Sequence, residues 1–144
     1  MDYLSAFQIS ASGMAVEKMR LDLTAANIAA MHTAAPNAAS VYRPMHVVAQ
    51  AVPLSFAQRF GQMSVSGGGA RIVAVEGDAS PPRRVYEPGH PYADAKGFVN
   101  YPAVDQVAEM LNVNTALRAY EANVAAMSAA RTMAARALDI GSSQ

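Results

Sequence analysis

The 144-residue chain contains no cysteine, which excludes disulfide bonds, thiolate metal sites and a cysteine nucleophile. Eleven basic residues balance eleven acidic ones, so the sequence lacks the positive excess that is typical of nucleic-acid-binding proteins. No run of about 18 apolar residues is present, and we therefore predict no membrane span. The first residues lack a basic region followed by an apolar run, so we expect no cleaved signal peptide.

Proline and glycine are scarce at both ends of the chain. All eight prolines lie between Pro36 and Pro102, and only Gly13 and Gly141 of the nine glycines lie outside that range. Proline breaks helix interiors and glycine weakens them, so the two ends are expected to be helical and the middle irregular. This distribution divides the chain into three segments, residues 1–35, 36–102 and 103–144.

Apolar residues in the first segment recur at helical spacing and predict a helix from about Tyr3 to Met31. Two residues advance a helix by about 200°, so two apolar stripes lie on roughly opposite sides. A helix that is apolar on two sides needs neighbours on two sides, and we expect the second stripe to face adjacent molecules. The first stripe consists of Phe7, Met14, Leu21 and Ile28, and the second of Ile9, Val16 and Leu23.

The last segment predicts a helix of some 36 residues, about 54 Å long, that ends near Gly141. Its apolar residues alternate in steps of four and three, which is the spacing of a coiled-coil seam with one charged interruption. The fold class that follows is mainly α, with the terminal helices packed as an antiparallel coiled-coil-like pair. An ordinary helical hairpin within one chain is the alternative. The predicted seam consists of Val113, Leu117, Tyr120, Val124, Met127, Arg131, Ala134 and Leu138.

Several polar residues accompany these stripes. Asn27 lies near the end of the first helix, and Glu121 and Asn123 flank the predicted seam of the last. An asparagine beside an apolar seam can fix helix register, and Tyr120 would place its ring in the seam with the hydroxyl at the edge. The alternative is that Asn27 and Asn123 simply face solvent.

The middle segment predicts short strands and turns in a small β-rich or irregular unit. Alternation of apolar and polar residues and β-branched content are the signals for these strands. Two loops are expected at residues 66–69 and 79–82, which are rich in glycine, serine and proline. The strand candidates are residues 41–43, 46–48, 71–76 and 85–87.

No pattern in the sequence indicates catalysis, a cofactor or a metal. The triple glycine at residues 67–69 lacks the Lys-Ser or Lys-Thr of a phosphate-binding loop, and the histidines (His32, His46, His90) lack metal-ligand spacing. A glycosidase needs two carboxylates at a fixed separation, and Asp78 and Asp94 instead occupy stretches typical of solvated turns. We therefore expect a protein that is not an enzyme and that has no small-molecule substrate.

Six short stretches, taken together, resemble a known family. Near the C-terminus these are Gly-Phe-Val-Asn-Tyr-Pro-Ala-Val-Asp, Arg-Ala-Tyr-Glu-Ala-Asn-Val and Ala-Leu-Asp-Ile-Gly, at residues 97–105, 118–124 and 137–141. Near the N-terminus they are Ala-Ser-Gly-Met, Arg-Leu-Asp-Leu and Ala-Asn-Ile-Ala, at residues 11–14, 20–23 and 26–29. These motifs resemble those of the rod and hook axial proteins of the bacterial flagellum. The short length of the chain and its 97–105 stretch are most similar to those of the proximal rod members. The sequence departs from the family at Ala30, Met31 and His32, which replace the polar turn usual there.

The resemblance implies a structural subunit of the flagellar basal-body rod. Such a subunit polymerises helically through its terminal helices and forms the drive shaft and the wall of the export channel. The implied partners are other copies of the chain, other rod proteins and the type III export apparatus, with the basal (MS) ring and the export gate as further candidates. The implied location is the periplasmic rod, reached without a cleaved signal. The alternatives are a soluble coiled-coil adaptor and, less favoured, a small peptidoglycan hydrolase.

Overall fold

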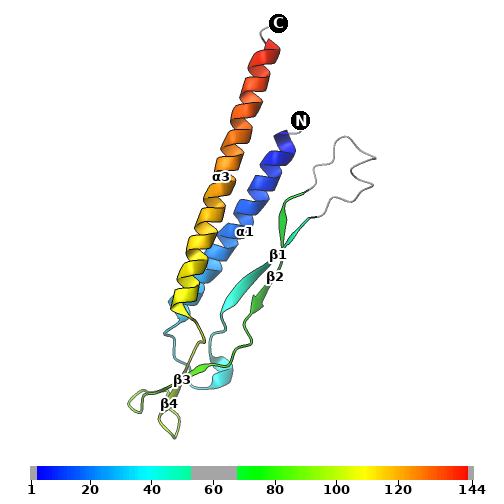
Figure 1. The fold of residues 1–144 in the computed structure, drawn as a ribbon. Coiled ribbons are helices and arrows are strands. Elements are labelled where there is room, and N and C mark those ends of the chain that lie inside the picture. The colour runs from blue at the N-terminus through cyan, green and yellow to red at the C-terminus, as the bar shows by residue number, and fades with distance from the viewer. Residues whose placement is uncertain (1–2, 53–67, 143–144) are drawn as a thin grey trace.

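The computed structural model describes residues 3–52 and 68–142 and shows two long helices accompanied by two β-hairpins (Figure 1). The predicted class, mainly α with a small β-rich middle, is confirmed. None of the described helices is both long and apolar enough to cross a membrane. The elements are α1 (Tyr3–Ala30), the 3-10 helix η1 (Ala38–Ser40), β1 (Met45–Ala51), β2 (Ala70–Gly77), β3 (Arg83–Tyr86), β4 (Phe98–Tyr101) and α3 (Gln106–Ser142).

Helices α1 and α3 lie side by side and run in opposite directions (Figure 1). Helix α3 begins where Asp105 caps it, because the Asp105 Oδ1 atom accepts a 2.9 Å hydrogen bond from the Val107 amide. Helix α1 ends one residue before the predicted Met31, and the Thr33 amide closes its last turn by donating to the Ala30 carbonyl at 2.9 Å. Both helices therefore end close to where proline content and capping residues place them.

Small side chains form the contact between the two helices. Ala116 and Ala130 of α3 are buried, and Gly13 of α1 faces Asn123 so closely that a Cβ atom on Gly13 would lie 2.7 Å from the Asn123 Oδ1 atom. A side chain at residue 13 would therefore require the end of the Asn123 side chain to shift. Small side chains at the contact thus allow the two helices to lie close together.

Strands β1 and β2 form an antiparallel hairpin that packs against α1 (Figure 1). Met45 pairs with Gly77 and Ala51 with Ala70, with a bulge between Val48 and Ala49. The hairpin is fixed to α1 by Ser12, whose Oγ atom accepts a 3.0 Å hydrogen bond from the Ala70 amide. This contact gives α1 a second neighbour within the same chain.

Strands β3 and β4 pair antiparallel beyond the end of the helix pair that lies opposite the chain termini (Figure 1). Val99 and Pro102 are fully buried there, and the Ala35 amide donates to the Asn100 carbonyl at 3.1 Å. Strand β4 was not predicted. Among the described residues it pairs with β3, from which the loop 87–97 separates it. The predicted strand at 41–43 is wrong, because Val41 caps η1 and Pro44 has no amide to donate.

We expect Gly69→Ala to destabilise the protein by about 2–4 kcal/mol. Gly69 has φ +112, a conformation that strains any L side chain by about 1–3 kcal/mol. The added Cβ atom would also lie 2.4 Å from the Ser12 Oγ atom and disturb its hydrogen bond to Ala70, worth about 0.5–1.5 kcal/mol. Thermal or urea unfolding followed by circular dichroism measures the loss.

Gly89→Ala is the matched control, because nothing lies within 4 Å of a Cβ atom at that position. It should change the free energy of unfolding by no more than about 0.5 kcal/mol. Equal stability of the two variants would show that the hairpin does not depend on the Ser12–Gly69 contact.

Candidate assembly surfaces

The face that α3 turns toward α1 is rotated from the predicted seam. Ala116, rather than Leu117, is buried, and Leu117 and Val124 are 43% and 45% exposed. One residue turns a helix by about 100°, so a shift of one position, from Leu117 to Ala116 and from Val124 to Asn123, turns these large side chains away from α1. The reason is the close approach at Gly13, which small side chains permit and leucine or valine would prevent. Val113 and Met127 keep partly buried positions, and Tyr120 lies at the edge with 36% of its surface exposed.

The two predicted stripes of α1 are not divided between this chain and its neighbours. Val16, assigned to the outward stripe, is 5% exposed and thus buried within the single chain. Ile9 of the same stripe lies against the hairpin, where Gly68 and Gly69 approach it, although much of its side chain is exposed. The hairpin supplies the second neighbour that the sequence assigned to other molecules. Leu23 and the first-stripe residues are half-buried, namely Phe7, Met14, Leu21 and Ile28.

A row of apolar side chains remains exposed along α3. Its members are three, seven, seven and fourteen residues apart, which are helix-packing spacings, and Arg131 stands at the heptad position between Val124 and Leu138. The row extends about 47 Å. Scattered apolar residues are normal on protein surfaces, whereas an ordered row indicates an interaction surface. We call it the outer stripe, and it consists of Val107, Met110, Leu117, Val124 and Leu138.

Asn27 joins the end of α1 to the start of β1. Its side chain is 2% exposed, its Nδ2 atom donates to the Met45 carbonyl at 2.9 Å, and its Oδ1 atom accepts from the Met45 amide at 2.9 Å. The Tyr42 hydroxyl donates to the same Oδ1 atom at 2.9 Å. Asn27 therefore neither faces solvent nor belongs to a helix seam. Its spacing in the sequence did not indicate that its buried side-chain amide would bind the backbone of β1.

Asn123 and Glu121 differ in their surroundings. Asn123 faces Gly13, and its Nδ2 atom donates to the Ala119 carbonyl one turn earlier at 2.8 Å. Glu121 is exposed on α3. The Tyr-Glu-Ala-Asn motif thus places the Asn123 side chain against Gly13 of α1 and leaves Glu121 open to solvent.

The two carboxylates considered for hydrolysis hold turns instead. The Phe98 amide donates to Asp94 at 3.0 Å and lowers the pKa of this carboxyl, with further help from the Lys96 amide and Arg84. Hydrogen bonds from the Ser80 amide and hydroxyl likewise lower the pKa of Asp78. A general acid needs a raised pKa, so neither group is suited to that role. Among residues 3–52 and 68–142, no group of three or more His, Asp or Glu side chains is arranged to hold a metal.

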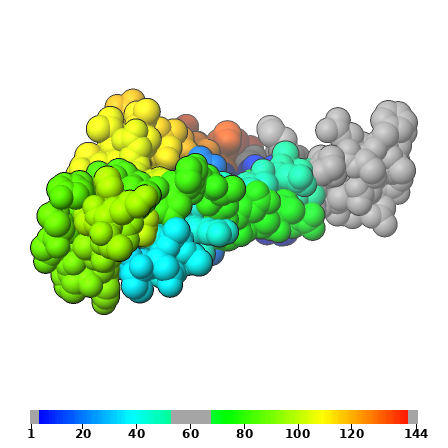
Figure 2. Space-filling model, turned by 90° about the horizontal axis from the view of Figure 1, so that it is seen from below, coloured from blue at the N-terminus to red at the C-terminus, as the bar shows by residue number. Residues whose placement is uncertain are grey.

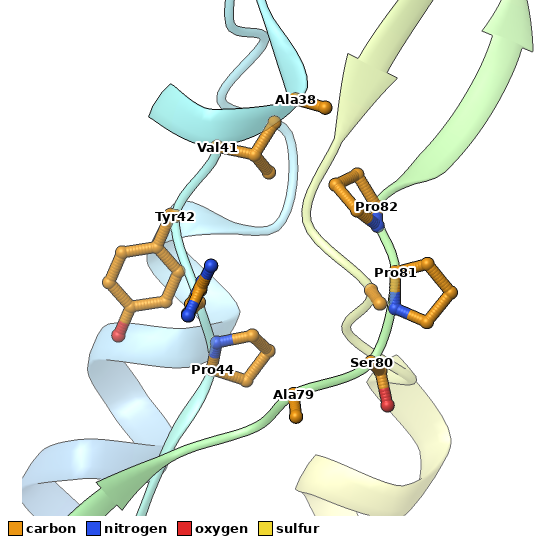
Figure 3. A pocket seen from close by; sticks show the side chains of 10 residues that line it. Ala38, Val41, Tyr42, Pro44, Ala79, Ser80, Pro81 and Pro82 are labelled. Atoms are coloured by element: carbon orange, nitrogen blue, oxygen red, sulfur yellow. The ribbon is translucent and has the colours of Figure 1, made fainter.

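An open groove of about 230 Å³ lies between η1 and the loop that follows β2 (Figure 3). Val41 and Pro44 line one wall and Pro81 and Pro82 the other, while the Tyr42 ring points away from the groove. Its walls expose polar and apolar atoms about equally, and Arg43 is the one charged side chain that lines it. The side chains that line this groove include no pair that could act as general acid and general base.

Comparison with known proteins agrees with an assembly role. A family model described as the C-terminal part of the flagellar basal body rod FlgEFG protein matches residues 95–140. The flagellar basal-body rod protein FlgC of Salmonella typhimurium is 35% identical over 143 residues, covering 98% of this chain and 99% of that protein. FlgC of Yersinia enterocolitica is 34% identical over 141 residues (98% and 99%), and FlgC of Bacillus subtilis 36% over 141 residues (92% and 94%).

The chain belongs to the FlgC family of flagellar basal-body rod proteins. It is a structural subunit of the rod, located in the flagellar basal body, and it is not an enzyme. The family assignment gives no support to the alternatives of a coiled-coil adaptor or a peptidoglycan hydrolase.

We expect Asn27→Ala to destabilise the chain by about 2–4 kcal/mol. The change leaves the Met45 amide and carbonyl and the Tyr42 hydroxyl without a partner, and each buried unsatisfied group costs about 1–3 kcal/mol, less where water can reach it. Chemical denaturation measures the effect. Asn114→Ala, at an exposed position of α3, should change stability by less than about 0.5 kcal/mol. A comparable loss in both variants would show that the hydrogen bonds of Asn27 do not stabilise the chain.

The Asp94 turn should loosen only in strong acid. Because the folded-state pKa of Asp94 is lowered from 3.8, its ionised form stabilises the fold at pH values above 3.8. This stabilisation is lost as the pH falls through the folded-state pKa. The amide shifts of Lys96 and Phe98, followed by NMR, should titrate with a midpoint below 3.8, and Asp94→Asn should abolish the step. A midpoint at or above 3.8 would show that these hydrogen bonds do not favour the carboxylate.

Proposed function

We propose that this chain assembles into the proximal part of the rod as a helical polymer, with its two terminal helices forming the wall around the export channel. The observation that carries the proposal is the outer stripe of α3, which one folded chain leaves exposed along nearly the whole helix. Within each subunit, α1 and α3 would form an antiparallel coiled-coil-like pair with Gly13 and Asn123 at its narrowest point.

The length of the outer stripe matters for the strength of assembly. Fully burying one apolar side chain of this size contributes about 1.5–3 kcal/mol. Association costs about 4–15 kcal/mol in lost freedom of motion. One contact falls short of this cost, whereas burial of the five stripe residues against neighbours would contribute up to about 7.5–15 kcal/mol, which is comparable to it.

Partners and route follow from the same proposal. Neighbouring subunits would be other copies of this chain and other rod proteins, with the MS ring and the export gate as further contacts at the base. The chain would leave the cytoplasm through the flagellar type III apparatus, without a cleaved signal, and assemble in the periplasm. Membership of the FlgC family and the near neutrality of the chain, which leaves self-association unopposed by charge, support these assignments.

We expect Leu117→Asp and Val124→Asp to abolish incorporation into basal bodies while leaving the isolated chain folded. Both side chains are exposed in one chain, so the charge is harmless there. In the polymer it would be buried without a partner, at a cost of about 3–5 kcal/mol. The measurements are immunoblotting of purified basal bodies, swimming motility, and circular dichroism of the purified variants.

Ala122→Asp is the matched control, because Ala122 is exposed on α3 about 140° from Leu117 and about 200° from Val124. It should enter basal bodies normally. Ala116→Asp should instead unfold the isolated chain, since Ala116 is fully buried against α1. Normal motility of the Leu117→Asp variant would rule out the outer stripe as the assembly contact, and discrete dimers without higher assembly would favour an adaptor.

A further inference from the structure

The outer stripe of α3 needs a partner surface that differs from the stripe itself. If the stripes of two copies packed on one another, the contact would be isologous, and such a two-fold contact closes a dimer instead of extending a polymer. A subunit of an open polymer therefore needs a second patch that complements the stripe and lies elsewhere on the molecule. This inference rests on the proposed function, in which the stripe is the assembly contact.

The β1–β2 hairpin carries a second row of exposed apolar side chains. Val73 and Val75 of β2 are 47% and 44% exposed. They alternate with Ile72 and Ala74, which are half-buried. Because alternate residues of a strand share a face, the exposed Arg71 lies in line with the two valines. We call Arg71, Val73 and Val75 the β2 row, and it extends over about 13 Å.

The exposed apolar residues of α1 and β3 offer no comparable row. Leu4, Ile9 and Met19 of α1 are five and ten residues apart, so they point in directions that differ by about 140° and 80° around the helix. Tyr86 of β3 already packs its ring edge-on against Phe98, with the ring centroids 5.4 Å apart. The β2 row is therefore the surface that best matches an apolar stripe.

The β2 row and the outer stripe belong to different sides of the molecule. Helix α1 packs against α3 and also against both strands of the hairpin. In Figure 2, α3 (yellow to orange) lies in the upper part of the view, and the strands β1 and β2 (cyan to green) lie below it. One copy can therefore present its outer stripe to one neighbour and its β2 row to another.

Each of the two surfaces also contains a charged side chain without a partner. Arg71 stands at one end of the β2 row, and Glu121 lies on α3 one turn after Leu117, about 40° from it around the helix. Both charged side chains are exposed, and neither forms an ion pair within the described part of the chain. Their charges are opposite, so the two surfaces are complementary in charge as well as in apolar character.

We propose that the β2 row of one copy packs on the outer stripe of the next copy, with Arg71 beside Glu121. Along α3, Leu117 lies four residues, or about 6 Å, from Glu121. Along β2, Val73 lies two residues, or about 7 Å, from Arg71. A strand that runs antiparallel to α3 therefore places Val73 on Leu117 when the two charges meet.

The same alignment accounts for the rest of the β2 row. Val75 lies about 13 Å from Arg71, which places it on the part of the stripe between Leu117 and Met110. The contact is heterologous, because it joins two different patches. Each copy that is added therefore presents a new, uncovered stripe to the copy that follows.

The chain contains no cysteine, so introduced thiols are the only ones in it and can report this contact. Val73→Cys and Leu117→Cys are combined in one chain, which replaces the unmodified chain in a flagellated strain, and purified basal bodies are treated with a short thiol-specific crosslinker. Because each copy carries both cysteines, we expect a ladder of dimers, trimers and larger oligomers of this chain on a denaturing gel. Each single-cysteine variant should remain monomeric.

Val73→Cys combined with Ala122→Cys is the matched control, because Ala122 is exposed on α3 about 140° from Leu117. It should give no ladder. Three results would each overturn the proposal: dimers from either single-cysteine variant, an equal ladder from the control pair, and no ladder although the Val73→Cys, Leu117→Cys chain is present in basal bodies. If that chain fails to enter basal bodies, Val75→Cys with Met110→Cys provides the second pair.

Failure of this contact and failure of the proposed function give different results. Exclusion of Leu117→Asp from basal bodies without any ladder from the cysteine pairs would leave the outer stripe as an assembly surface and remove the β2 row as its partner. Absence of the unmodified chain from basal bodies would instead contradict the proposed function itself.

Exchange of the two charges tests the ion pair. Arg71→Glu or Glu121→Arg, introduced alone into the Val73→Cys, Leu117→Cys chain, places like charges opposite each other and should lower the ladder yield roughly fivefold. The two changes together restore opposite charges and should return the yield to within about twofold of the original. Lys18→Glu, at an exposed position of α1, should have no effect. A yield that stays low in the double exchange would overturn the pairing of Arg71 with Glu121.

Discussion

The close approach of α1 and α3 determines most of the remaining structure. Gly13 lies against the end of the Asn123 side chain, and Ala116 and Ala130 complete a contact surface of small side chains. Val113 and Met127 of α3 are partly buried, but several other large apolar side chains of this helix are not used for packing within the chain. Those side chains, Leu117 and Val124 among them, are therefore exposed on the flank of the pair. The same constraint that holds one chain together makes its surface suitable for assembly.

The middle segment depends on the helix pair for its position. An isolated two-stranded hairpin is marginally stable in water. Here the β1–β2 hairpin is fixed at one end by Ser12 and at the other by Asn27, which binds the backbone of Met45. Both residues belong to motifs that resemble those of the rod and hook family. Both residues are helical, yet their side chains bind the backbone of the β1–β2 hairpin, which follows the helix in the chain.

Helix existence and length could be predicted from the sequence, because proline distribution and capping by Asp105 are local signals. The rotation of α3 about its axis could not. Leu117 and Ala116 are adjacent and both fit a heptad, and only the partner surface at Gly13 decides between them. Val16 was misassigned for a similar reason, since the hairpin that gives α1 a second neighbour is formed by residues far along the chain. Strand β4 likewise depends on a partner, β3, that is separated from it by a loop.

An exposed apolar row would be a liability for a soluble monomer, because contiguous apolar surface promotes association. For a rod subunit the same row determines how strongly and in which orientation neighbours bind. The neutral balance of eleven basic and eleven acidic residues adds no repulsion between copies. The direction in which subunits add to the rod must then come from an asymmetry between the two ends of the molecule. The extension of α3 past α1 creates such an asymmetry, since one end presents the tip of α3 and the other the region where α1 ends and α3 begins.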